Sequence, residues 1–253
     1  MDGSKTHTEV NWRDGSVPVS PIFDDAFFAY HDGRAETSEV FIAGNALPER
    51  WAEGRGCNVA ELGFGTGLNF LETVRQWRTV AMRHGRRAAP RLTFTSFELY
   101  PIPAEAMLQS LARWADLAPF AADLIQRWPP AGPGLFEIET FAGLDVCLRV
   151  HVGDARATLP SAGLTDSIDA WYLDGFSPAK NPELWGVDLL THVFRTTRAG
   201  GTFSTYTAAG WVRRNLANAG FEVRKVKGYA AKRERLSGVK RQAARALPDE
   251  QAP

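Results

Sequence analysis

The sequence predicts a Rossmann-like α/β fold, in which helices cover both faces of a mostly parallel, doubly wound sheet. Three observations support this fold class. Expected strands alternate with expected helices from Cys57 onward, which is typical of strand–helix–strand units. The segment 168–173 is apolar almost throughout, as a central parallel strand covered on both faces should be. A glycine-rich turn, 63–67, separates an expected strand from an expected helix.

The individual elements follow from local patterns. In residues 68–77, Phe70, Val74 and Trp77 recur at i, i+4 and i+7, so an amphipathic helix is expected there. Residues 103–128 are expected to be helical, and Gly220 can end a helix over 209–219. Strands are expected at 57–62, 91–98, 136–140, 146–152, 168–173 and 201–207, followed by an antiparallel terminal hairpin of 221–226 and 233–239.

The bulk properties indicate one large α/β domain with additions at both ends. We expect residues 1–55 to form an N-terminal extension packed on the core, 56–240 the main domain and 241–253 a disordered tail. Cys57 and Cys147 are too few for a disulfide framework, which favours a reducing compartment. No signal peptide begins the sequence and no apolar run approaches the ~18 residues of a membrane span, so we expect a cytoplasmic protein with no membrane partner.

Charge is distributed unevenly along the chain. The formal net charge is zero, with 29 basic and 29 acidic residues. Between Gly210 and Arg245, however, eleven Lys or Arg face only two acids, Glu222 and Glu234. Such a segment can dock a polyanion or can be an ordinary solvated face, and charge alone leaves both interpretations open.

The glycine turn has details that distinguish between cofactors. A dinucleotide fingerprint reads G-x-G-x-x-G with an acid about 20 residues later. Here the spacing is G-x-G-x-G, and the next acid at a strand end, Glu98, follows Gly67 by 31 residues. The turn also begins with Glu61, which would repel a pyrophosphate but suits the cationic groups of S-adenosyl-L-methionine. The pattern resembles motif I of class I methyltransferases, although a glycine turn without a ligand remains an alternative.

Two further acids occupy the ends of expected strands. Glu98 is expected to accept both ribose hydroxyls, unless it is an ordinary strand-end charge. Asp154 is expected to accept the adenine amino group, unless it caps the following helix. The cofactor contacts are therefore assigned to Glu61, Gly63, Phe64, Gly65, Thr66, Gly67, Asn69, Glu98, Asp154 and Asp174.

The stretch 171–182 runs from an apolar strand directly into a polar loop with two prolines. Ligands of open α/β sheets lie beyond the carboxyl ends of the strands, so Asp174 should face both the glycine turn and a substrate. An amine nucleophile must be neutral when it attacks the sulfonium methyl group. A carboxylate can orient the amine and help to remove its proton, and Asp174 is the expected catalytic residue. The alternative is a structural Asp that bonds its own loop.

Together, five stretches resemble the tRNA 5-methylaminomethyl-2-thiouridine synthesis family, the MnmC/MnmD-type methyltransferases. The resemblance spans about residues 17–240, and the stretch 174–182 is highly specific. The five stretches are, in order, 23–25 (Phe-Asp-Asp), 44–50 (Gly-Asn-Ala-Leu-Pro-Glu-Arg), 63–70 (Gly-Phe-Gly-Thr-Gly-Leu-Asn-Phe), 174–182 (Asp-Gly-Phe-Ser-Pro-Ala-Lys-Asn-Pro) and 232–234 (Lys-Arg-Glu).

The resemblance implies a reaction, a cofactor and a partner. The family methylates the amine of 5-aminomethyl-(2-thio)uridine at the tRNA wobble position with S-adenosyl-L-methionine, which implies that the anticodon loop is the substrate. The target base would have to leave the loop and enter a pocket. Phe176, Lys180, Lys232 and Arg233 are the expected substrate contacts. The family commonly has Gly and Arg before Lys-Arg-Glu, whereas Ala230 and Ala231 stand there in this chain.

Many relatives are fused to an FAD-dependent oxidoreductase that produces the aminomethyl substrate. This sequence has no second glycine fingerprint, so we expect a stand-alone methyltransferase domain that acts with a separate aminomethyluridine-producing enzyme. Two other functions remain as alternatives: a methyltransferase of small-molecule amines and a non-catalytic tRNA-binding module. The loop spacing and Glu61 argue against a nicotinamide dehydrogenase. The five histidines have no ligand spacing with cysteines or acids, so no metal is expected.

Overall fold

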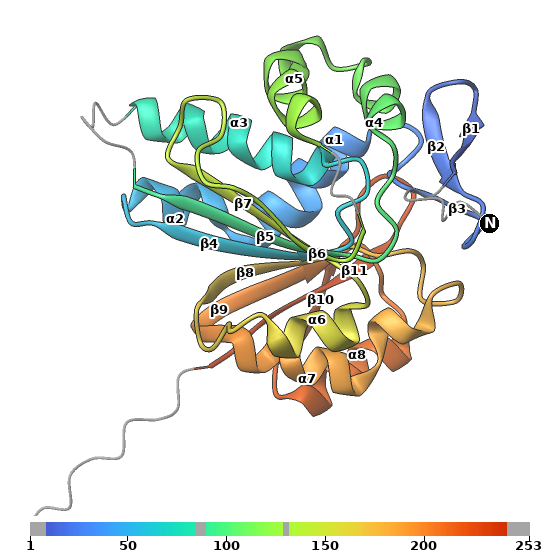
Figure 1. The fold of residues 1–253 in the computed structure, drawn as a ribbon. Helices are drawn as coiled ribbons and strands as arrows, with labels where there is room; N and C mark the ends of the chain where they lie inside the picture. Colours follow the sequence, from blue (N-terminus) through green and yellow to red (C-terminus); the bar gives the residue numbers. More distant parts are fainter. Residues whose placement is uncertain (1–8, 84–89, 129–131, 242–253) are drawn as a thin grey trace, which may run out of the picture.

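A mixed sheet of eight strands runs through the part of the chain that the structure describes, and helices cover both of its faces (Figure 1). The structure is a computed structural model, and it describes residues 9–83, 90–128 and 132–241. The strand order is β10-β11-β9-β8-β4-β5-β7-β6. The bounds are β4 (Cys57–Leu62), β5 (Leu92–Glu98), β6 (Gly134–Ile138), β7 (Val146–Val152), β8 (Ile168–Leu173), β9 (Thr197–Thr205), β10 (Glu222–Lys227) and β11 (Glu234–Val239).

The five central strands are parallel and the strands at both edges are antiparallel. β4 pairs in parallel with β5 and β8, which extend the sheet in opposite directions to β7 and β9. At one edge the β10–β11 hairpin pairs antiparallel with β9, and at the other β6 pairs antiparallel with β7. The Rossmann-like fold class is therefore confirmed, and β6 adds an antiparallel edge.

The helices divide between the two faces of the sheet (Figure 1). One face is covered by α1 (Gly33–Glu36), α2 (Leu47–Ala52), α3 (Leu68–Arg83), α4 (Ala104–Leu111) and α5 (Ala118–Arg127). The other is covered by α6 (Ala155–Ser161), α7 (Val187–Thr196) and α8 (Gly210–Ala219). Each face has its own apolar core, and all six residues of β8 are buried between the two cores. No helix among the described residues is long and apolar enough to cross a bilayer.

One expected helix is wrong as a single element. Residues 103–128 form α4, a 3₁₀ turn (Ala115–Leu117) and α5, because Trp114 leaves helical geometry at φ −117° and ψ 88°. Pro119 supports the break, since proline lacks an amide hydrogen and fits only the first turn of a helix. Gly220 ends α8 in the left-handed region at φ +117°, as expected.

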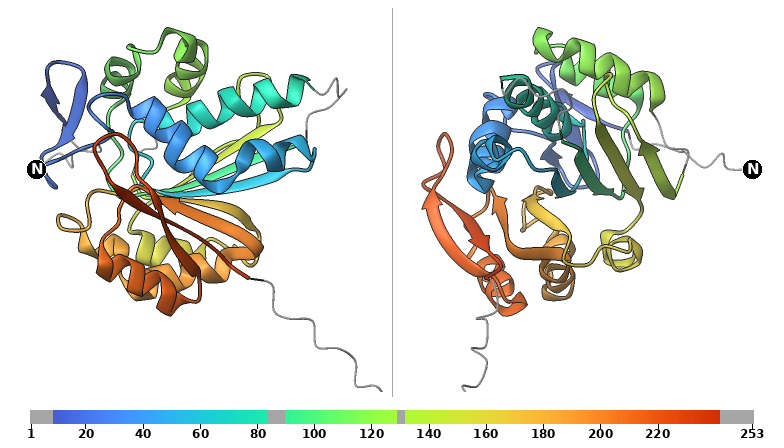
Figure 2. Two further views of the ribbon diagram at one scale, coloured as in Figure 1. Left: turned by 180° about the vertical axis from the view of Figure 1, so that it is seen from behind. Right: turned by 90° about the vertical axis from the view of Figure 1, so that its left-hand side faces the viewer.

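The N-terminal segment lies against the main sheet and its helices. It contains a small sheet of β1 (Asn11–Arg13), β2 (Val17–Ser20) and β3 (Asp25–Ala26), then α1, a π-helix (Thr37–Ile42) and α2. The Arg34 guanidinium donates to both carboxylate oxygens of Asp116 at 2.7 Å and to the buried Glu72 at 2.9 Å. Figure 2 shows the β10–β11 hairpin beside this segment. The tail expected over 241–253 lies outside the described residues apart from Arg241.

Candidate active site

A cavity of about 750 Å³ opens beyond the carboxyl ends of β4 and β8. This is where the strand order reverses, because the chain extends the sheet from β4 to β5 and β7 and then returns to β8 on the other side of β4. The cavity is lined by the glycine turn, the loop after β8, the N-terminal segment and the turn between β10 and β11. Its volume is within the range of small-molecule and cofactor sites.

The glycine turn is packed too closely for side chains at two positions. Gly63 has φ +88°, and a Cβ there would lie 2.6 Å from the carbonyl oxygen of Asp174. Gly67 has φ +78°, and a Cβ there would lie 2.9 Å from the Leu124 side chain. Gly63, Phe64, Gly65 and Thr66 line the cavity. Gly67 does not line it, so a glycine is needed at this position because the turn packs closely against α5.

Glu98 lies at the end of β5 and holds the glycine turn in place. One carboxylate oxygen accepts from the backbone N–H groups of Phe64 at 2.8 Å and Gly65 at 2.9 Å, and the other accepts from Tyr100 N–H at 2.7 Å. Glu98 lines the cavity although it is only 8% exposed. A carboxylate has about four acceptor positions, so this one retains capacity for a ribose hydroxyl.

Asp154 lines the cavity but its carboxylate already has partners. It caps α6 by accepting from Arg156 N–H at 2.9 Å, and it pairs with the Arg156 guanidinium at 2.6 Å. The helix cap, which the sequence left open as an alternative, is therefore present. The bond to Arg156 lowers the pKa of Asp154, so this carboxylate stays ionised.

Glu61 lies beneath the cavity and does not line it. The side chain is fully buried and accepts from Asn69 Nδ2 at 2.8 Å and from Ser96 Oγ at 2.9 Å. Burial, with a further contribution from the Asp174 carboxylate, raises the pKa of Glu61 well above its usual range. Glu61 therefore does not reach the cavity to make the cofactor contact that the sequence predicted, and its link to the cavity is its hydrogen bond with Asn69, which does line it.

Asn69 joins the two acids of the site. Its Nδ2 also donates to Asp174 Oδ2 at 2.7 Å, while its Oδ1 accepts from Thr37 Oγ1 at 2.6 Å. Asp174 follows the buried strand β8 and lines the cavity. Burial is the main cause that raises the pKa of Asp174 to about 7. A carboxylate with this pKa can both accept and release a proton near neutral pH.

The loop after β8 is held by the first residues of the N-terminal segment. Phe176 lines the cavity and stacks on Phe23 at a centroid distance of 4.7 Å. Ser177 N–H donates to Asp25 at 2.8 Å. Lys180 donates to the backbone oxygen and the carboxylate of Asp24 and does not line the cavity. Its contact in the structure therefore holds the loop against the N-terminal segment, and the expected contact with a substrate stays a prediction.

The turn between β10 and β11 contributes one of its two expected residues. Lys232 lines the cavity, and its Nζ lies 3.2 Å from Glu36. Arg233 does not line it. Sequence reasoning missed Glu36 and Tyr206, which both line the cavity. Glu36 ends a helix of only four residues, which is too short for a periodic signal. Tyr206 directly follows a strand, and in the sequence it cannot be told apart from an aromatic residue of the core.

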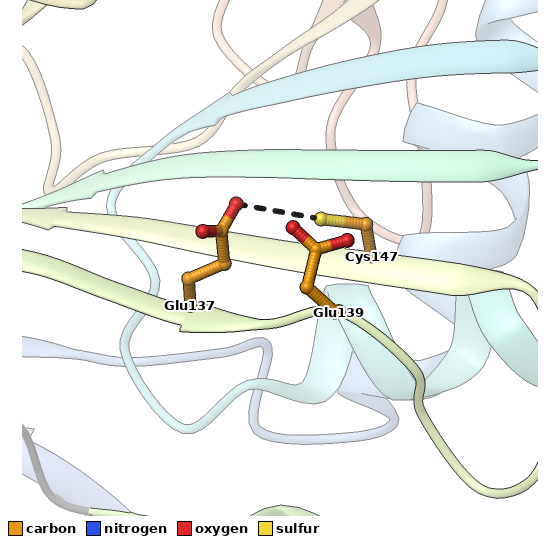
Figure 3. Close-up of side chains that lie close together, drawn as sticks. All are labelled: Glu137, Glu139 and Cys147. Carbon is orange, nitrogen blue, oxygen red and sulfur yellow. Dashed lines mark hydrogen bonds between the residues drawn. The ribbon is translucent and has the colours of Figure 1, made fainter.

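One cluster of metal-ligand residue types lies away from the cavity, and its carboxylates are already paired with arginines. Among the described residues, Glu137, Glu139 and Cys147 bring ligand atoms close together (Figure 3). Arg149 pairs with Glu137 and Arg91 pairs with Glu139, so both carboxylates have cationic partners. Burial raises the pKa of the Cys147 thiol, which disfavours the thiolate that a metal would need. The absence of a metal remains a prediction.

Comparison with known proteins provides a family. A family model described as S-adenosyl-L-methionine-dependent methyltransferase matches residues 115–241. The tRNA 5-methylaminomethyl-2-thiouridine biosynthesis bifunctional protein MnmC of Aeromonas salmonicida (strain A449) is 42% identical over 236 residues. The match covers 92% of this chain but 35% of the relative, so the chain spans about a third of that protein's length.

One solved structure shares the fold of this chain. The crystal structure of MNMC2 from Aquifex aeolicus has a TM-score of 0.71 at 22% identity, and the match covers 97% of this chain and 74% of that one. A spermidine synthase from Thermotoga maritima is less similar, with a TM-score of 0.48 at 10% identity over 92% of this chain and 72% of that one.

Proposed function

The chain belongs to the S-adenosyl-L-methionine-dependent methyltransferase family, and we propose that it methylates the amine of 5-aminomethyl-(2-thio)uridine at the wobble position of tRNA. The product would be 5-methylaminomethyl-(2-thio)uridine. The observation that carries the proposal is the Asp174 carboxylate, which lies in the cavity between the glycine turn and an aromatic loop. The match to MnmC supports the choice of substrate.

The lining of the cavity fits the cofactor. A nucleoside can approach the backbone of Gly63, Phe64, Gly65 and Thr66, because this turn has no bulky side chain at its two close approaches. We assign the ribose of the cofactor to Glu98 and its adenine to Asp154. Asn69, which is hydrogen-bonded to Glu61, lies toward the amino-acid end of the cofactor. The acids of this lining suit the two cationic groups of the cofactor better than they would suit a phosphate.

The residues of the chain perform the steps around the transfer. When bound, the cofactor supplies an electrophilic methyl group on its sulfonium. Asp174 attracts the substrate ammonium and accepts one proton from it, which leaves a neutral amine with a free electron pair. In the transfer, the nitrogen–methyl bond would form as the sulfur–methyl bond breaks, and the bonding electrons would remain on the sulfur of the cofactor. Asn69 holds the carboxylate of Asp174 in position through its 2.7 Å bond.

The tRNA side of the proposal rests on charge and aromatic residues. We propose that Phe176 stacks on the extruded base, while Lys232 and Arg233 contact the backbone of the anticodon loop. Lys180 would act indirectly, because it ties the loop of Phe176 to Asp24. On this account residues 56–240 carry the methyltransferase domain. The protein would act in the cytoplasm after another enzyme has made the aminomethyl group.

The second candidate function is methylation of a small-molecule amine, which the same Asp174 chemistry would permit. The two candidates are separated by incubating the protein with methyl-labelled S-adenosyl-L-methionine and either tRNA carrying 5-aminomethyl-2-thiouridine or the free nucleoside. Transfer to the tRNA at least ~100-fold more efficient than to the nucleoside is expected, because remote contacts contribute to binding in the transition state. Equal efficiency on both substrates would favour the small-molecule function.

A further inference from the structure

A cation of the chain itself, the Lys232 ammonium, lies in the wall of the cavity that also contains Asp174. The Lys232 ammonium lies 3.2 Å from Glu36 Oε1 and 4.1 Å from the centroid of the Tyr206 ring. All three residues line the cavity together with Asp174. A carboxylate beside an aromatic face is the combination that binds alkylammonium groups in proteins.

The two receiving groups are fixed more firmly than the cation that they hold. The Glu36 side chain is 13% exposed, and the segment that carries it is anchored through Arg34. The Tyr206 hydroxyl donates to the backbone oxygen of Gly175 at 2.7 Å, which fixes the ring beside Asp174. Lys232, in contrast, is 47% exposed and lies in the turn between β10 and β11. The carboxylate and the ring are preorganised, whereas the lysine can leave.

The charges of this group influence one another. Burial is the main cause of the raised pKa of Asp174, and the Glu36 carboxylate raises it further while Lys232 lowers it. If Lys232 left without replacement, two carboxylates would face each other in a partly buried cavity, which is unfavourable. A second cation that enters as Lys232 leaves avoids this cost.

We propose that Glu36 and the face of Tyr206 form the subsite for the substrate ammonium, and that Lys232 occupies this subsite until tRNA binds. The inference rests on the proposed function and names the residues that would select the aminomethyl group. The substrate brings both an ammonium and phosphates. The ammonium replaces Lys232 at Glu36, and Lys232 pairs with a phosphate instead, so the charges stay balanced during the exchange.

The exchange provides selectivity against unmodified uridine. A wobble uridine without the aminomethyl group has no cation to offer, so it leaves Glu36 with Lys232 and the subsite closed. Sites built to bind a polar group reject an analogue that lacks it, because their own polar groups would be left unpaired. Asp174 would then receive the proton of an amine that Glu36 has already positioned.

The test compares the affinity of the full chain for two tRNAs, in the presence of S-adenosylhomocysteine. The tRNAs differ only at the wobble position, which carries 5-aminomethyl-2-thiouridine in one and 2-thiouridine in the other. In the Glu36→Gln variant, the ratio of the affinities for the aminomethyl tRNA and the 2-thiouridine tRNA should fall about tenfold, as expected when one charged hydrogen bond is removed. The matched control Glu39→Gln, on the same segment but exposed and outside the cavity lining, should keep the preference.

A second variant decides between the subsite and a simpler role of Glu36 as partner of Lys232. Lys232→Met should keep or increase the preference for the aminomethyl tRNA, since the internal competitor is gone. The inference is overturned if Glu36→Gln weakens the binding of both tRNAs equally. It is also overturned if Lys232→Met removes the preference for the aminomethyl tRNA. The Lys232→Met result decides even if Glu36→Gln does not fold. A wild type that prefers the aminomethyl tRNA but transfers no methyl group would overturn the proposed function and leave the subsite supported.

Discussion

Asp174 combines two properties that a catalytic carboxylate needs. It lines the cavity, and burial raises its pKa to about 7, so it can accept and release a proton near neutral pH. Its partner Asn69 holds one of its oxygens at 2.7 Å and leaves the other available. The sequence predicted this residue because an acid directly after a buried parallel strand must lie at the ligand-binding edge of the sheet.

Replacement of Asp174 should separate catalysis from cofactor binding. The Asp174→Asn variant keeps the size of the side chain and an acceptor for Asn69, but it cannot take a proton. We expect the rate of methyl transfer to fall by about 10²–10⁴-fold, the usual contribution of general base catalysis. Single-turnover kinetics measure the rate and calorimetry measures cofactor affinity. Asp188→Asn, an exposed acid on α7 outside the cavity lining, is the control that should leave both unchanged.

The same carboxyl should destabilise the ligand-free protein at alkaline pH. Its pKa is about 7 in the folded state and near its ordinary 3.8 when unfolded, so the folded state binds more protons between these pH values. Its contribution to stability is therefore full below about pH 4 and is lost as the pH rises through 7. Asp174→Asn should raise the melting temperature by several degrees at pH 8, with a smaller gain at pH 5. A gain that does not change between the two pH values would contradict the assigned pKa.

Other residues of the site were beyond what the sequence predicts. Glu36 and Tyr206 reach the cavity only because the N-terminal segment and the loop after β9 fold over it. The position of Glu36 depends on the long-range contacts of Arg34 with Glu72 and Asp116, and that of Tyr206 on its bond to the backbone oxygen of Gly175. Glu61 shows the opposite case, since the expected acid is present but one layer too deep to line the cavity.

Among the elements, the turn after β4 and the loop after β8 depend on each other. Gly63 allows the two to meet, because a Cβ at this position would lie 2.6 Å from the backbone oxygen of Asp174. A backbone atom cannot move aside as the end of a side chain can. The distance between the cofactor turn and the catalytic carboxylate is thus set by the absence of one methyl group.

Gly63→Ala should therefore weaken cofactor binding by at least about tenfold, which calorimetry with S-adenosyl-L-methionine measures. Gly163→Ala is a matched control. Gly163 also has positive φ, at +69°, but a Cβ there would meet no atom within 4 Å. Both variants pay a similar backbone strain of about 1 kcal/mol. Equal cofactor affinity in the two variants would show that the contact with the Asp174 backbone does not matter.

The regular elements were predicted where a local signal existed. The strand expected at 168–173 agrees with β8 because its apolar run is unbroken, and Gly220 correctly marked the end of α8. The helix over 103–128 was wrong because its apolar pattern continues across Trp114, although the chain turns there. α1, with four residues, has too few turns to produce a period.

At the scale of the whole molecule, the basic C-terminal region is less unbalanced than its composition indicates. Several of its cations have carboxylate partners, as Lys225 has in Glu234 and Arg241 has in Glu222. Lys227 and Arg233 are exposed next to the turn of the hairpin and have no ion-pair partner among the described residues. Both are therefore free to contact a polyanion that approaches the turn of the hairpin.

A salt titration of tRNA binding tests this surface. Replacing both Lys227 and Arg233 by Gln should reduce the slope of log K against log salt by up to about 2, since each phosphate contact contributes roughly 0.7–0.9. Arg195→Gln, an exposed cation on α7 that also has no ion-pair partner in the described chain, should leave the slope unchanged. An unchanged slope in the double variant would place the tRNA on another face.

The proposed reaction changes one nitrogen atom of one nucleoside. The most direct measurement is mass spectrometry of the wobble nucleoside after tRNA carrying 5-aminomethyl-2-thiouridine has been incubated with S-adenosyl-L-methionine and either the wild type or Asp174→Asn. The wild type should convert the nucleoside to its 5-methylaminomethyl form, and the variant should convert little or none over the same time. An unmethylated wobble nucleoside with the wild type, under conditions in which the cofactor binds, would contradict the proposed reaction.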